Sequence, residues 1–165
     1  MNIHSAARLL TVSAFAILGA VSAIAPAAAA DSHRHDAHAA VLKLNDGARW
    51  QTDAALRTGM ESIRGALAQA LPDVHGGRYS AAQYQALGDA VEQQVGYIVQ
   101  NCKLEPAADE VLHAVIADIG KGVDVIAGRA GGVEREQGVV LLVGALDAYA
   151  SHFDHPGWKA LETGH

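Results

Sequence analysis

Residues 52–72 read TDAALRTGMESIRGALAQALP, and this stretch decides the fold class. Its large apolar residues recur every three or four positions, which places them on one face of a helix: Leu56, Met60, Ile63, Leu67 and Leu71. Thr52 is predicted to cap the start of this helix, from Asp53, and Pro72 is predicted to end it at Leu71. The stretch therefore predicts an amphipathic helix that buries one face.

Two further stretches repeat this spacing, and a third is apolar over much of its circumference, at residues 139–143, Leu146, Tyr149 and Phe153. The second helix is predicted to follow a cap at Ser80, the third to start at Pro106, and the fourth to span roughly Glu134 to Asp154. No stretch alternates apolar and polar residues convincingly, so no strand is expected. Helices of similar length joined by short links predict an all-α, antiparallel up-down-up-down four-helix bundle. The apolar faces of the second and third helices are Tyr84, Leu87, Val91, Val95, Ile98 and Cys102, then Leu112, Val115, Ile116, Ile119, Val123 and Ile126.

The first 30 residues have the features of a secretory signal peptide. Arg8 precedes an apolar run over residues 9–25, and three alanines, residues 28–30, come directly before the first acid, Asp31. Small residues at these positions favour cleavage after Ala30 and export to the periplasm. There are two alternatives: the segment is retained as an N-terminal membrane anchor, or it is cleaved one residue earlier. The predicted organisation is a signal peptide (1–30), a His-rich flexible arm (31–47) and the bundle (48–165).

Composition excludes several classes of function. The net charge is −6 and no basic run occurs, which argues against nucleic acid and against a membrane surface once the signal is cleaved. The single cysteine, Cys102, excludes an internal disulfide and would allow a disulfide-linked homodimer if its thiol is exposed. No Ser-His-Asp arrangement, paired catalytic carboxylates, phosphate loop or His-Glu-x-x-His motif occurs, so the protein is predicted not to be an enzyme.

Cleavage after Ala30 would create a metal chelate at the new N-terminus, Asp31-Ser32-His33. The free amine, two deprotonated backbone amides and the His33 imidazole give four nitrogens in one plane, the geometry that Cu(II) and Ni(II) prefer. His35 and His38 follow at once. The arm is therefore predicted to bind copper.

The predicted bundle would gather further metal ligands in one half. These are Met60, Cys102, His113, His152 and His155. Their angular positions place the first two inside the bundle and the helical histidines at its edge, and sulfur ligands select Cu(I). We expect a carrier, buffer or sensor of copper that works with a periplasmic metal-handling protein. The alternative is that none of these residues binds metal: Met60 would fill space in the core, Cys102 would be buried and inert, and the histidines would be solvated.

Two segments resemble the cytochrome b562-type bundles. Residues 56–63, LRTGMESI, are similar to the opening of their first helix, and residues 148–152, AYASH, to the end of their last helix. In that family a methionine and a histidine at these places are the axial ligands of haem. The resemblance implies a haem b electron-transfer protein with Met60 and His152 as ligands, although Ala150 stands where the family has its histidine. A structural or stress-response binding module without metal is the third alternative.

Four short phrases resemble a family of small exported proteobacterial proteins with four helices. The phrases are LNDG (44–47), WQTD (50–53), NCKL (101–104) and FDHPGW (153–158). This resemblance covers nearly the whole mature chain. It implies a helical fold and export, and no particular ligand.

Overall fold

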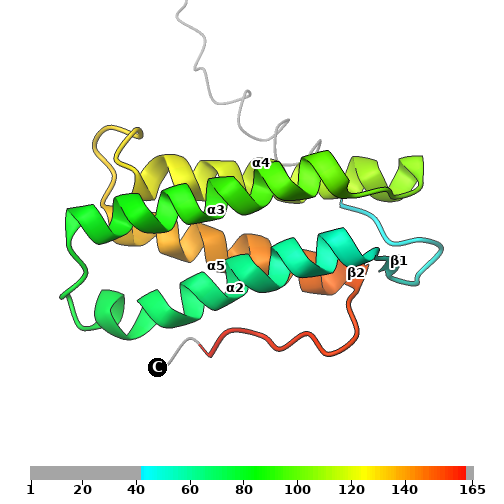
Figure 1. Ribbon diagram of the computed structural model, residues 1–165, viewed down its shortest axis with the longest axis horizontal. Helices are drawn as coiled ribbons and strands as arrows, with labels where there is room; N and C mark the ends of the chain where they lie inside the picture. The colour runs from blue at the N-terminus through cyan, green and yellow to red at the C-terminus, as the bar shows by residue number, and fades with distance from the viewer. Residues whose placement is uncertain (1–41, 163–165) are drawn as a thin grey trace, which may run out of the picture.

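The structure, a computed structural model, describes residues 42–162 (Figure 1). They form four helices, which confirms the all-α class: α2 (Ala54–His75), α3 (Ala81–Asn101), α4 (Pro106–Ile126) and α5 (Arg135–His152). Two short strands, β1 (Trp50–Gln51) and β2 (Phe153–Asp154), accompany them. The predicted signal peptide and His33, His35 and His38 of the arm lie outside the described residues.

Helix α2 has different ends from those predicted. Asp53, not Thr52, is its N-cap, and the Asp53 side chain accepts a hydrogen bond of 2.7 Å from the Leu56 amide. The helix also continues through Pro72 to His75. Proline inside a helix removes its own amide donor and crowds the carbonyl four residues earlier, but the additional turn buries Val74 in the core. The free energy gained by burying this turn outweighs the cost of a proline inside the helix, so the helix does not end at Leu71 as predicted.

The other helix starts are confirmed. Ser80 caps α3 in a capping box with Gln83, and Pro106 is the first residue of α4, where its missing amide costs no helical hydrogen bond. Cys102, predicted on the face of the second helix, is instead the C-cap of α3. Its side chain therefore lies at the end of the helix, where it is partly buried and packs against the core.

The two strands correct the prediction that the chain has none. They pair in parallel, with Trp50 opposite Phe153 and Gln51 opposite Asp154. Helix α5 consequently ends at His152, before the predicted boundary at Asp154. The Thr52 hydroxyl also donates to the Asp154 carbonyl at 2.7 Å, across 102 positions of sequence. This small sheet joins the segment before α2 to the segment after α5.

The helices lie side by side, with their links at two ends (Figure 1). The links 76–80 and 127–134 lie at one end, which we call the loop end. The link 102–105 and the sheet lie at the other, which we call the sheet end. After β2 the C-terminal segment, residues 155–162, runs back along α2, where Lys159 and Leu161 share a surface hollow with Arg64.

The predicted apolar faces form the core. Leu56, Met60, Ile63 and Leu67 of α2 have no exposed surface, and the buried residues of the other helices pack against them. Helices α4 and α5 approach most closely at two glycines: a Cβ atom added at Gly138 would lie 2.7 Å from the Gly122 carbonyl oxygen. Among residues 42–162, no helix is long and apolar enough to cross a membrane.

Candidate functional site

The two predicted edge histidines each contact their own helix. The Nδ1 atom of His113 lies 2.8 Å from the Asp109 carbonyl oxygen and 3.4 Å from its carboxylate, and the side chain is 72% exposed. The Nδ1 atom of His152 lies 2.7 Å from the Ala148 carbonyl oxygen. Both positions agree with the predicted edge of the bundle, and in both the Nδ1 atom is occupied by a backbone contact.

The predicted bundle ligands do not form one metal centre. Across residues 42–162, no three side chains of the His, Cys, Asp and Glu types lie close enough together to hold a metal ion. Met60 has no exposed surface and belongs to the apolar core. Within the described part of the chain, Cys102, His113 and His152 therefore belong to no group of three such ligands.

Cys102 is paired with Asp53 at the sheet end. The half-buried thiol hydrogen-bonds the Asp53 carboxylate. This carboxylate also accepts a hydrogen bond of 2.6 Å from the Lys103 amide. Burial and the neighbouring carboxylate raise the pKa of Cys102 to about 12. Because the thiolate is the nucleophile, a protonated Cys102 is poorly suited to that role at neutral pH. The thiol interacts with the Asp53 carboxylate at the end of α3.

Asp53 links three segments through one carboxylate. It caps α2 through Leu56, and it accepts hydrogen bonds from the amide of Lys103 and the thiol of Cys102. Burial by itself would raise the pKa of Asp53, but these hydrogen bonds outweigh it and lower the pKa below 3.8. Asp53 is therefore a charged junction between the start of α2 and the end of α3.

Asp53→Ala is expected to lower the free energy of unfolding by about 2 kcal/mol, since it removes a helix cap and the acceptor for a second amide. Ser80→Ala, the matched control, removes a cap of α3 alone and should cost about 1 kcal/mol. Urea denaturation of both variants measures the difference. Equal losses would mean that the Lys103 and Cys102 contacts contribute no stability.

His155 forms the second polar cluster of the sheet end. Its side chain is buried, its Nδ1 atom lies 2.8 Å from the Tyr149 hydroxyl, and its Nε2 atom lies 3.7 Å from a Glu61 carboxylate oxygen. The Trp158 ring lies 5.0 Å from the imidazole, centroid to centroid. With Nδ1 as acceptor, the Tyr149 hydroxyl donates and Nε2–H faces Glu61. The cluster fastens the C-terminal segment to α2 and α5.

This cluster is neutral apart from Glu61 at physiological pH. Burial lowers the pKa of His155, and the attraction of Glu61 opposes this only in part. Burial also raises the pKa of Tyr149 far above its ordinary value. The pair is therefore a neutral imidazole and a neutral phenol, an arrangement that holds structure and carries no charge to a ligand.

Stability should fall as the pH drops below about 6.5, the ordinary pKa of histidine. The unfolded chain takes up a proton on His155 there, whereas the folded chain, with its lowered pKa, does so only at lower pH. Above this window the contribution of His155 is constant. The comparison is urea unfolding at several pH values for the parent and His155→Gln, because every other histidine is shared. Parallel stability curves would contradict the assigned pKa.

Sequence reasoning found His155 but missed its partners. Tyr149 was placed only as an apolar residue of the fourth helix, and neither Glu61 nor Asp53 carried a signal for a site. No protein-family model matches this chain, and no curated protein or solved structure shows significant similarity to it. The two resemblances in the sequence stay predictions, and the site is interpreted from its own geometry.

Proposed function

We propose that this chain is an exported, non-catalytic copper-binding protein in which residues 31–38 supply the Cu(II) ligands and the helices form a scaffold. One observation supports this division: the candidate histidines and the cysteine of the helical part all have partners within the fold. Cys102 contacts Asp53, His113 contacts Asp109, and His152 and His155 contact Ala148 and Tyr149. Met60 lies without exposed surface in the apolar core, so the histidines of the arm are the remaining ligands of the predicted set.

The chemistry of the arm fits Cu(II) better than Cu(I). After cleavage at Ala30, the amine of Asp31, two backbone amides and the His33 imidazole supply four nitrogen ligands, and tetragonal nitrogen sites favour Cu(II) or Ni(II). His35 and His38 add imidazoles nearby in sequence. The protein would then act as a periplasmic carrier, buffer or sensor and exchange copper with a metal-handling partner.

We further infer an antiparallel up-down-up-down order for the helices. The links between consecutive helices are short, which favours antiparallel neighbours. The contact of Asp53 with Lys103 joins the start of α2 to the end of α3, and the Lys43 ammonium lies 3.5 Å from Glu110 near the start of α4. In this order the N-terminal arm would leave the scaffold from the sheet end.

Titration of the purified mature protein with Cu(II), followed by visible absorption, tests the proposed site. We expect one equivalent to produce the band of a square-planar nitrogen site, and His33→Ala to abolish it. His113→Ala is the matched control, because it removes an exposed histidine of the scaffold and should leave the band unchanged. A band that survives in His33→Ala, or that disappears in Cys102→Ser, would refute the proposal.

A haem-binding experiment distinguishes the haem alternative from the copper proposal. The haem alternative requires iron to bind Met60, whose side chain has no exposed surface within an apolar core, so the core would have to open to admit a cofactor. When haem is added to the purified protein, we expect no difference in the Soret region between the parent and Met60→Leu. A Soret band that is present in the parent and lost in Met60→Leu would replace the copper proposal by the haem alternative.

A further inference from the structure

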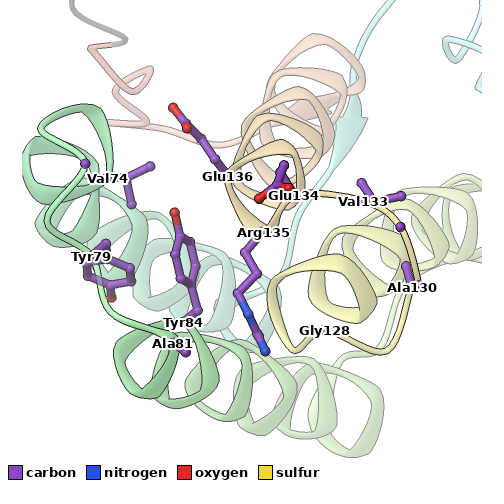
Figure 2. A pocket seen from close by; sticks show the side chains of 13 residues that line it. Val74, Tyr79, Ala81, Tyr84, Gly128, Ala130, Val133, Glu134, Arg135 and Glu136 are labelled. Carbon is purple, nitrogen blue, oxygen red and sulfur yellow. The ribbon is translucent and has the colours of Figure 1, made fainter.

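A hollow of about 530 Å³ opens at the loop end of the molecule (Figure 2). The end of α2, the start of α3, the link 128–133 and the start of α5 surround it. Volumes of this size are typical of sites for small ligands. None of the metal-ligand candidates lines this hollow, so its chemistry is independent of the proposed copper site.

Two tyrosines form one wall of the hollow. The rings of Tyr79 and Tyr84 lie 4.9 Å apart at 85°, an edge-to-face arrangement. Tyr84 is only 8% exposed, yet its hydroxyl has no hydrogen-bond partner within residues 42–162. Figure 2 shows this hydroxyl directed toward the start of α5, where Glu136 projects. A hydroxyl that lines a hollow without a protein partner is available to accept a hydrogen bond from a ligand.

The opposite wall carries more negative than positive side chains. Glu134 and Glu136 both line the hollow, and neither forms an ion pair within the described part of the chain. Arg135 lies between them in sequence, but its Nη1 atom donates to the Ile126 carbonyl at the end of α4. The amides at the start of α5 contribute only about half a positive charge. Arg135 keeps its positive charge and also lines the hollow, so the two carboxylates and one guanidinium of this wall leave an excess of negative charge that favours a cation.

We propose that this hollow binds a small organic cation with primary ammonium groups, of the aliphatic diamine class. One ammonium would pair with Glu136 or Glu134 and donate an N–H to the Tyr84 hydroxyl. Its methylene groups would lie against the tyrosine rings and Val74, and the ring faces attract the cation as well. The combination of acids, aromatic faces and an unpaired hydroxyl acceptor matches this chemistry better than that of an anion or a neutral sugar.

Calorimetric titration of the metal-free, full-length mature protein with 1,5-diaminopentane at low ionic strength tests the site. We expect saturable binding of one equivalent, and none of 1,5-pentanediol, which has the same length without charge, or of the dianion glutarate. Glu136→Gln is expected to weaken binding about fivefold and Tyr84→Phe about threefold, the size of single partly exposed contacts. Asp147→Asn, an exposed carboxylate elsewhere on α5, is the matched control and should leave the affinity unchanged.

Three results would overturn the proposal. These are no heat of binding at millimolar diamine, equal binding of glutarate, and equal losses in Glu136→Gln and Asp147→Asn, which would indicate diffuse attraction to an acidic protein. Thermal unfolding of each variant verifies that the helices remain folded. Should Glu136→Gln unfold, Tyr84→Phe, which preserves the ring and its packing, decides the outcome alone: unchanged affinity would refute the role of the hydroxyl.

Discussion

Gly138→Ala is expected to lower the free energy of unfolding by about 3 kcal/mol, even though alanine is the better helix former. The new Cβ atom would lie 2.6 Å from Cγ2 of Ile126, 2.7 Å from its amide nitrogen and 2.7 Å from the Gly122 carbonyl oxygen. Two of these three atoms belong to the backbone of α4, which can move away only if the helix moves. Because protein interiors are close-packed, that movement would disturb the interface of α4 with α5.

Gly144→Ala is the matched control for this prediction. Gly144 lies in the same helix, and a Cβ atom added there would meet nothing within 4 Å. The substitution should therefore raise the free energy of unfolding by about 0.5–1 kcal/mol through helix propensity. Urea denaturation of both variants gives the comparison. If Gly138→Ala is as stable as Gly144→Ala, then α4 and α5 do not approach as closely as described.

Met60→Ala is the second large effect, with an expected loss of about 3 kcal/mol in the free energy of unfolding. Met60 has no exposed surface, and it lies on the buried face of α2 between Leu56 and Ile63. Truncation would leave a cavity that the surrounding helices fill only in part. Met60→Leu preserves the volume and should cost less than about 1.5 kcal/mol.

The same pair of variants separates packing from ligation at Met60. Leucine lacks the thioether, so a metal or haem ligand at this position would be lost in Met60→Leu as completely as in Met60→Ala. We expect Met60→Leu to retain both its stability and its Cu(II) binding. Loss of copper from a stable Met60→Leu protein would instead identify Met60 as a ligand.

Local patterns were sufficient to predict the helices. The spacing of Leu56, Met60, Ile63 and Leu67 identified the buried face of α2, and Ser80 and Pro106 marked the starts of α3 and α4. Capping and helical periodicity depend on residues only a few positions apart, so a sequence displays them directly. Some helix ends were exceptions: Asp53 and not Thr52 caps α2, α5 ends at His152, and α2 continues past Pro72 because burial of Val74 depends on the other helices.

The missed features all join distant segments. The β1–β2 pair has two residues in each strand, too few to alternate visibly. The contacts of Asp53 with Lys103 and of His155 with Glu61 cross the fold, and nothing in the neighbouring sequence marks either pair. The angular positions did place Met60 inside and His113 outside. They could not reveal that Cys102 interacts with the carboxylate of Asp53.

The central claim is that copper binds the arm and that the helices only carry it. Native mass spectrometry of protein purified from the periplasm after growth with copper tests this claim most directly. We predict the mass of residues 31–165 with one copper ion, which His33→Ala loses and Cys102→Ser retains. A copper ion that disappears with Cys102→Ser and survives His33→Ala would contradict the account.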